Sequence, residues 1–171
     1  MKELKKNLKR FLRKYEGIED IIIFGSFVKD KFEPKDIDIA IISQDKNPSI
    51  VGEISSSLSE KTDIEVLSNN QIYQTRIGLS IISEGFSVKE NKFLRDMLGI
   101  EAKKIYSYDL KGLSASQKRA FNRALKEHLN KINGERLGSG CVMIPIEKTG
   151  FFEDFLEVWN LNVKSKEYKV W

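Results

Sequence analysis

The sequence predicts an α/β (α+β) fold in which short buried strands alternate with amphipathic helices, followed by a smaller C-terminal α/β unit. Several segments carry apolar residues at every third or fourth position, which is typical of amphipathic helices. Short β-branched and aromatic runs that end at turn-forming residues are typical of buried strands. Because the character of the chain changes near residues 104–112, we predict a first domain at residues 1–104 and a second unit at residues 105–171.

The first elements have clear local signals. Residues 2–15 combine apolar side chains at helical spacing with many lysines, which predicts a helix with a basic outer face. Residues 21–24 form a β-branched and aromatic run that ends at Gly25, which predicts a buried strand. Residues 36–42 and 62–67 predict two further strands. Acidic and apolar residues alternate at the start of the first segment and through most of the second.

Helices are predicted between and after these strands. One helix begins at Pro48, and Ser68 can cap another that runs to about Glu84. A further helix is predicted over roughly residues 90–103. The first domain therefore consists of strands separated by helices.

The second unit has its own signals. Ser114 and Gln117 have capping-box spacing at the head of a helix that ends near Ile132. His128 falls on the apolar side of that helix, which favours a packed, hydrogen-bonded histidine over a catalytic one. The remaining predictions are a glycine-rich loop over residues 134–140, a strand over residues 141–146, a helix capped by Thr149 and a closing strand over residues 163–170.

Composition excludes several classes of protein. Hydrophobic residues make up 40% of the chain and charged residues 32%, which is enough for a core and excludes a disordered chain. Apolar runs such as residues 37–42 are far too short to cross a bilayer, so we expect no membrane association. The lone Cys141 can form neither an internal disulfide nor a cysteine-based zinc site, and we expect a reducing cytoplasm as the location.

Positive charge is concentrated in two segments of a chain with a net charge of +4. Residues 2–14 carry seven lysines and arginines against Glu3, and residues 103–136 carry nine against three acidic residues. Two basic segments beside a neutral body favour a polyanionic partner, and the second unit is expected to bind RNA or a partner protein. The alternative is a solvated, lysine-rich surface. A stripe of exposed cations is predicted on the helix of the second unit at Lys118, Arg119, Arg123 and Lys126.

Paired acidic residues occur in two of the predicted strands. Residues 36–39 read Asp-Ile-Asp-Ile, so Asp36 and Asp38 lie on one face, roughly 7 Å apart along the strand. Two carboxylates beside isoleucines repel each other and lose hydration, and a bound divalent cation would offset both costs. If the strand that carries Asp63 and Glu65 lies alongside, Asp63 can complete a three-carboxylate cluster of the kind that binds Mg²⁺.

A glycine–serine pair follows the first predicted strand. Glycine lets the backbone approach a ligand closely, and the next turn offers N–H groups to a phosphate. Ser26 can add a hydroxyl donor, and Lys29 lies one turn further on. A Gly-Ser pair by itself marks an ordinary turn. Combined with Asp36, eleven residues after Gly25, and with a third acidic strand, it predicts a nucleotide site.

The glycine–serine pair, the following lysine and the three aspartates at this spacing resemble the nucleotidyltransferase superfamily of DNA polymerase beta. Within that superfamily, the closest resemblance is to the minimal nucleotidyltransferases of prokaryotes, and it covers about residues 18–90. It implies a short mixed sheet flanked by helices. Residues 76–88 also resemble the helix and short strand that end the minimal proteins.

The resemblance implies a role for each site residue. Gly25 and Ser26 would contact the triphosphate of an NTP, with Lys29 assisting. Asp36 and Asp38 would bind two Mg²⁺ or Mn²⁺ ions, and Asp63 would be the third metal ligand and would activate the attacking hydroxyl.

Two positions depart from the family pattern. Asp30 stands where the family usually has glycine, although aspartate tolerates the left-handed conformation better than most residues. Glu65 replaces a residue that is usually apolar, which leaves Asp63 and Glu65 as alternatives for the third ligand; the family position favours Asp63.

These patterns lead to two functional hypotheses. The first is a metal-dependent nucleotidyltransferase that moves a nucleoside monophosphate from an NTP to a hydroxyl of RNA, protein or a small molecule. The alternative is a non-catalytic module that binds a partner protein or nucleic acid, such as an antitoxin-type component of a two-gene pair.

Overall fold

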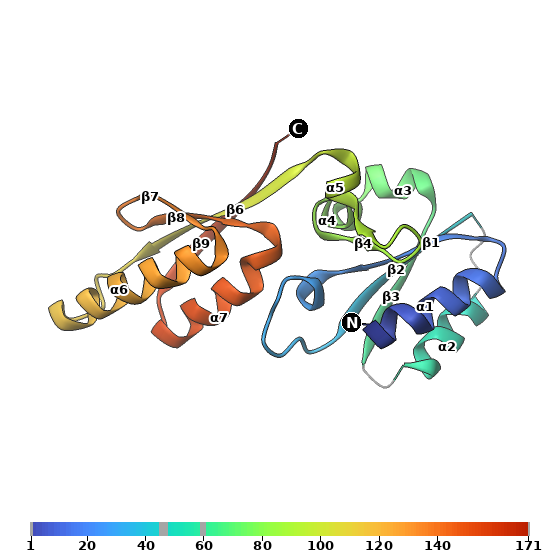
Figure 1. The fold of residues 1–171 in the computed structure, drawn as a ribbon, viewed down its shortest axis with the longest axis horizontal. Coiled ribbons are helices and arrows are strands. Elements are labelled where there is room, and N and C mark those ends of the chain that lie inside the picture. The colour runs from blue at the N-terminus through green and yellow to red at the C-terminus, as the bar shows by residue number, and fades with distance from the viewer. Residues whose placement is uncertain (1, 45–47, 59–60, 171) are drawn as a thin grey trace. The chain divides into compact units, whose positions relative to one another are not determined.

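The computed structural model describes residues 2–44, 48–58 and 61–170. The chain forms two compact units, each with its own hydrophobic core (Figure 1). The first comprises Met1–Val28 and Glu33–Ile100, and the second comprises Lys29–Phe32 and Glu101–Trp171. No helix within the described residues is both long enough and apolar enough to cross a membrane.

The first unit is built on a mixed sheet of five strands. The strands are β1 (Ile18–Phe24), β2 (Ile37–Ser43), β3 (Thr62–Leu67), β4 (Phe86–Ser87) and β5 (Lys92–Phe93). They lie in the order β3-β2-β1-β4-β5; the β2–β3 pair is parallel and the other pairs are antiparallel. The mixed sheet implied by the family resemblance is therefore confirmed.

Helices cover both faces of this sheet. They are α1 (Lys2–Lys14), the 3-10 helix η1 (Gly25–Val28), α2 (Pro48–Ser57), α3 (Asn69–Gln74), α4 (Arg76–Glu84) and α5 (Leu94–Leu98). Leu8 of α1 and Ile54 of α2 pack on one face against the buried isoleucines of β1 and β2. Ile81 of α4 packs on the opposite face. Figure 1 shows α1 and α2 on one side of the strands and α3 and α4 on the other.

Two predicted helices of this region differ from the structure. The helix predicted from Ser68 to Glu84 is divided at Thr75, whose extended backbone ends α3 and whose side chain caps α4 by accepting a hydrogen bond from the Gly78 N–H (3.1 Å). The helix predicted over residues 90–103 is wrong. This stretch contains β5, the short α5, a left-handed turn at Gly99 and the start of a long strand.

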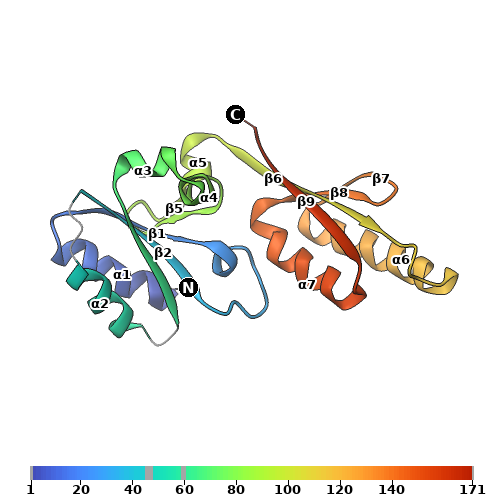
Figure 2. The same ribbon diagram turned by 180° about the vertical axis from the view of Figure 1, so that it is seen from behind.

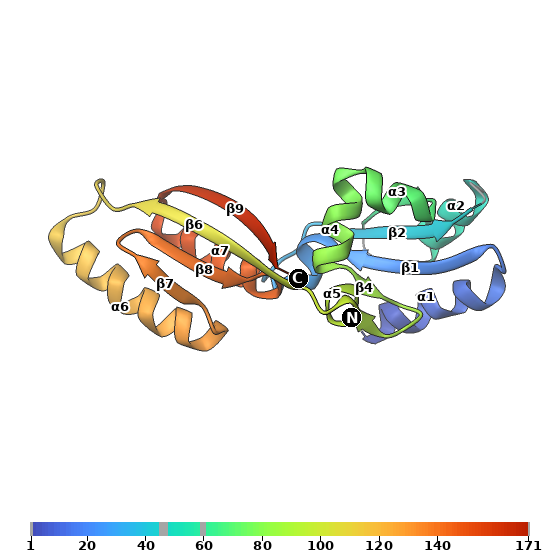
Figure 3. The ribbon, with the colours of Figure 1, turned by 90° about the horizontal axis from the view of Figure 1, so that it is seen from above.

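The second unit is an antiparallel sheet with two helices on one face. Its elements are β6 (Glu101–Asp109), α6 (Ala115–Ile132), β7 (Glu135–Gly138), β8 (Cys141–Pro145), the 3-10 helix η2 (Ile146–Lys148), α7 (Thr149–Trp159) and β9 (Asn162–Val170). The strand order β7-β8-β6-β9 with this element order is the β-α-β-β-α-β, ferredoxin-like arrangement. Figure 2 shows β9 beside β6 from behind, and Figure 3 shows all four strands side by side.

Of the local signals in the second unit, the capping box is confirmed, and the predicted cap at Thr149 and the glycine-rich loop differ from the structure. Ser114 and Gln117 form the predicted capping box of α6, with the Gln117 side chain accepting from the Ser114 N–H at 2.9 Å. Thr149 does not cap α7; it is the first helical residue, Lys148 holds the capping position, and the Thr149 hydroxyl donates to the carbonyl of Ile146. The glycine-rich stretch predicted as a loop contains β7, which pairs with β8 across a tight turn.

Candidate active site

The turn after β1 brings a backbone and a carboxylate into direct contact. Gly25 follows the last residue of β1 and has a φ of +75°. A Cβ atom on Gly25 would lie 1.7 Å from Oδ2 of Asp38, so the position has no space for a side chain. Backbone conformation and close contact therefore both require glycine here, at the head of η1 and directly before Ser26.

The register between β2 and β3 places two of the predicted acids side by side. Asp38 is the direct partner of Asp63 in this parallel pair, whereas Glu65 lies opposite the buried Ala40. Side chains alternate along both strands, so the two aspartates are on one face, with neighbouring strands about 4.8 Å apart. Asp38 is half-buried against Gly25, and Asp63 is exposed. The third predicted acid, Asp36, lies in the bend that directly precedes β2.

The carboxylates of this site suit a divalent cation such as Mg²⁺ whose remaining ligands come from water and substrate. In the described ranges, no group of three or more aspartate, glutamate, histidine or cysteine side chains is gathered closely enough to hold a metal ion. The predicted triad of Asp36, Asp38 and Asp63 is thus not a closed three-ligand group in this structure. Mg²⁺ is commonly held through one or two carboxylates, with waters and substrate phosphates as its other ligands, and paired aspartates at a glycine turn fit that pattern.

A buried glutamate that sequence analysis did not select is part of the same site. Glu84, the last residue of α4, is 5% exposed, and its Oε1 accepts a hydrogen bond from the N–H of Gly25 (3.2 Å). This contact ties the turn after β1 to the end of α4. A signal was present in the sequence, because Glu84 continues the apolar spacing of Ile77 and Ile81 on the buried side of the helix.

A buried arginine lies next to this glutamate. Arg95 of α5 is 9% exposed; its guanidinium lies 4.1 Å from the centre of the Phe93 ring and donates to the carbonyl of Ser83 at 3.5 Å. Ser83 directly precedes Glu84 in α4. Arg95 therefore joins α5 to the end of α4, the element that positions the carboxylate against Gly25.

Lys29 and Asp30 belong to the segment Lys29–Phe32, which groups with the second unit. The carbonyl of Lys29 accepts from the Gly150 N–H (3.1 Å), and the Asp30 carboxylate accepts from the Lys148 ammonium (2.6 Å). Asp30 has a φ of +54°, which confirms that aspartate adopts the left-handed conformation here. The structure thus brings Gly25, Asp38 and Asp63 together in the first unit but groups Lys29 with the second.

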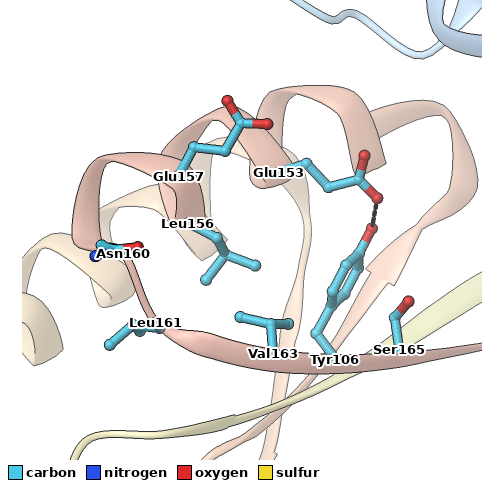
Figure 4. Close-up of a pocket in the computed structure, with 8 residues that line it drawn as sticks. All are labelled: Tyr106, Glu153, Leu156, Glu157, Asn160, Leu161, Val163 and Ser165. Atoms are coloured by element: carbon cyan, nitrogen blue, oxygen red, sulfur yellow. Dashed lines mark hydrogen bonds between the residues drawn. The ribbon is translucent and has the colours of Figure 1, made fainter. Parts of the chain in front are cut away.

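The second unit contains a pocket of about 420 Å³ lined by residues of α7, β6 and β9 (Figure 4). Leu156 and Val163 give it an apolar wall, while Glu153 and Tyr106 point toward each other at one end. The Tyr106 hydroxyl donates to Oε1 of Glu153 at 2.7 Å, and the Lys104 ammonium donates to the same oxygen at 2.8 Å. The pocket has the volume of small-molecule sites.

The titration behaviour of this cluster follows from its contacts. Burial, followed by the hydrogen bond to Glu153, raises the pKa of Tyr106 well above its ordinary value, so the phenol is a neutral donor. Burial alone would raise the pKa of Glu153, but hydrogen bonds from Lys104 and Tyr106 and the lysine charge together lower it. Glu153 is therefore a stable carboxylate that connects β6 to α7.

His128 is confirmed as a packed residue. Its ring stacks on Phe151 and Phe155 with centroid distances of 4.4 and 4.5 Å, and Nε2 lies 3.4 Å from the carbonyl oxygen of Phe151. Burial is the main reason that its pKa is lowered, so the ring is neutral near pH 7.

Comparison with known proteins bears on the first unit. The family model described as "Polymerase beta, Nucleotidyltransferase" matches residues 6–94. No curated protein matches the chain.

Three solved structures show limited similarity. A toxin–antitoxin structure with AMP-PNP has 16% identity and a TM-score of 0.40, covering 75% of this chain and 94% of that chain. A mutant of the toxin–antitoxin MntA-HpeT has 15% identity and a TM-score of 0.39, covering 75% and 93%. A structure from Shewanella oneidensis has 15% identity and a TM-score of 0.36, covering 77% and 93%.

Proposed function

The chain belongs to the polymerase beta nucleotidyltransferase family, and from this premise we propose that it transfers a nucleoside monophosphate from an NTP to an acceptor hydroxyl. The observation that supports this most strongly is the register of β2 and β3. This register places Asp38 directly beside Asp63. The Asp38 carboxylate also lies against Gly25, where a side chain would overlap with it.

Each side chain of the site has a role in this proposal. Asp36 and Asp38 would hold the divalent cation. A bound Mg²⁺ or Mn²⁺ ion would supply the charge neutralisation that phosphoryl transfer requires. Gly25 allows the triphosphate to approach the backbone, the Ser26 hydroxyl donates to a phosphate oxygen, and Glu84 keeps the turn in place.

The transfer forms one bond and breaks another. The acceptor oxygen attacks the α-phosphorus of the NTP, the bond from that phosphorus to the oxygen bridging the β-phosphate breaks, and pyrophosphate leaves with the electron pair. The acceptor's proton passes to a carboxylate. We assign this step to Asp63, because its side chain is exposed and accessible to an incoming hydroxyl.

Three acceptor classes carry a hydroxyl that this reaction can use: RNA, protein and small molecules. These acceptor classes are separate arms of the test that follows.

The experiment is a labelling screen. The protein is incubated with each of the four NTPs, labelled at the α-phosphate, with Mg²⁺ or Mn²⁺, and with total RNA, total protein or a metabolite extract. We expect label in one acceptor class with the wild-type protein and a loss of at least about 100-fold with Asp38→Asn, because a charge-stabilising group is removed.

A matched pair of variants tests the assignment on β3. Asp63→Asn should abolish transfer, whereas Glu65→Gln, which changes the other acid of the same strand and lies opposite Ala40, should retain it. Equal losses from the two variants would contradict the role given to Asp63. If the wild-type protein labels no acceptor class with any NTP, the enzyme proposal fails, and binding without transfer is then the function to pursue.

A further inference from the structure

The outer face of α1 forms a groove that differs chemically from the rest of the first unit. The groove has a volume of about 380 Å³, and all of its lining side chains are polar or charged. Six of them are cations, Lys2, Lys5, Lys6, Lys9, Arg10 and Arg13. The seventh, Asn91, lies in the turn between β4 and β5, and no acidic residue lines the groove.

The cations are crowded by the fold and not only by the sequence. The Lys5 ammonium lies 3.5 Å from the centre of the buried Phe86 ring of β4, which draws this lysine toward the body of the unit. Burial, and secondly the positive charge of Lys9, lower the pKa of Lys5. Lys5 is therefore partly removed from water and repelled by a neighbouring cation. A polyanion bound in the groove would offset both costs.

We propose that this groove binds the sugar–phosphate backbone of single-stranded RNA. The charge pattern supplies the attraction, because phosphates bind through lysines and arginines irrespective of base sequence. Asn91 offers both a donor and an acceptor within the groove, and a ribose 2′-hydroxyl can pair with both. If the proposed transferase activity holds, this RNA presents the acceptor hydroxyl; the binding itself does not depend on that activity.

Two other partners fit the groove less well. A membrane-binding helix needs a free apolar face to insert between lipids, but Leu4 and Leu8 are buried in the core and Phe11, Leu12 and Tyr15 pack against it. A protein partner usually contributes and meets aromatic or apolar anchors at the centre of an interface, and the lining contains none. Six cations with no aromatic or aliphatic side chain among the lining residues fit a nucleic-acid backbone better than either partner.

The test measures RNA affinity by fluorescence anisotropy, without NTP or divalent metal, over a series of salt concentrations. The probe is a short fluorescein-labelled single-stranded RNA of mixed sequence. The variant is Lys6→Gln combined with Arg13→Gln, two exposed side chains whose replacement by a good helix former leaves the core unchanged. For a lost phosphate contact at each site, the slope of log K against log salt should become shallower by about 1.4, and affinity at physiological salt should fall on the order of tenfold.

A charge-matched control separates this groove from general attraction. Arg119→Gln combined with Lys126→Gln removes one arginine and one lysine at the same spacing from the exposed face of α6. We expect little effect on the RNA slope from this control. An equal or larger loss in the α6 variant would overturn the proposal. So would equal binding of the matching DNA strand, or binding to phosphatidylserine-containing vesicles with no binding to RNA.

The outcome is independent of the transferase test. Asp38→Asn should bind the RNA probe as tightly as the wild-type protein, whether or not the wild-type protein transfers nucleotides. If RNA is the labelled acceptor, the α1 variant should require several-fold more RNA for half-maximal transfer with an unchanged KM for the NTP. RNA binding without RNA labelling would support the groove and remove only the RNA acceptor.

Discussion

At the scale of single residues, a side chain at Gly25 would meet two obstacles at once. The position has a φ of +75°, and a Cβ atom would overlap with Oδ2 of Asp38. We predict that Gly25→Ala lowers the free energy of unfolding by about 1–3 kcal/mol and displaces Asp38, with a loss of nucleotide transfer. Urea unfolding and the labelling assay measure the two effects.

Gly52 provides the control for this variant. It lies within α2, has no positive φ, and a Cβ atom there would meet nothing within 4 Å. Gly52→Ala should raise the stability by about 0.5–1 kcal/mol, because alanine loses less entropy than glycine in a helix. The same change in the free energy of unfolding for Gly25→Ala and Gly52→Ala would contradict the contact with Asp38.

Glu84 allows a second prediction at this scale. Its Oε1 accepts the Gly25 N–H, and the side chain is almost completely buried. Glu84→Ala should leave that N–H without its acceptor, lower the stability by about 1–3 kcal/mol and raise the KM for the NTP, because the turn is no longer held in position. Steady-state kinetics with the labelled acceptor separate KM from kcat.

Glu84→Gln distinguishes a positioning role from a purely structural one. Glutamine retains an amide oxygen that can accept from the Gly25 N–H, so the KM for the NTP should return toward the wild-type value. An unchanged KM in Glu84→Ala, with only a loss of stability, would show that the glutamate supports the fold but not the turn.

At the scale of elements, the carboxylate of Glu153 joins β6 to α7 through Tyr106 and Lys104. Its folded pKa lies below the ordinary glutamate value of 4.5, so ionised Glu153 stabilises the folded state above pH 4.5. That contribution should disappear as the pH falls through the lowered folded pKa. Urea unfolding at a series of acidic pH values should therefore show a loss of stability that is smaller in Glu153→Gln.

The control is the pH profile of Glu153→Gln itself. This variant cannot ionise at position 153 but preserves the side-chain length and an acceptor for the Tyr106 hydroxyl. Parallel profiles for wild type and variant would mean that Glu153 does not contribute through its charge.

Pairing between elements also decided where sequence analysis was wrong. Residues 101–103 were predicted to end a helix, but β6 begins at Glu101 and pairs with β9 along its whole length and with β8 from Lys103 to Ser107. Hydrogen bonds to two neighbouring strands and burial of Ala102, Tyr106 and Tyr108 outweigh a local helical preference. The strands that pair with β6 lie dozens of residues away, so a short stretch of sequence around residues 101–103 does not contain them.

At the scale of the whole molecule, each unit encloses its own core. The core of the second unit is formed by α6, α7 and the inner face of the sheet, with Phe121 in contact with the rings of Tyr108, Phe155 and Trp159. We predict that residues 101–171 fold when expressed alone and unfold cooperatively on heating, as followed by circular dichroism.

Phe121→Ala is the matched variant for the isolated second unit. Phe121 is 0% exposed, so its truncation should cost about 3–5 kcal/mol and abolish or strongly lower the thermal transition. A gradual, non-cooperative melt of the unaltered fragment would contradict an independent core.

The sequence by itself predicted the features that depend on local chemistry. Residues 62–67 form the predicted strand, Ser114 and Gln117 form the predicted capping box, and Asp30 adopts the left-handed conformation. The glycine, serine and aspartates at their spacing also carried the resemblance to the nucleotidyltransferase family, which the family model over residues 6–94 confirms.

Only the tertiary structure decided which of these residues meet. It placed Asp63, not Glu65, opposite Asp38, and it brought Glu84 to Gly25 across 59 positions of sequence. It also showed that α1 presents its cations in a groove with Asn91. Strand register and the docking of helices depend on packing between distant segments, and a single sequence records the participants of such contacts but not their partners.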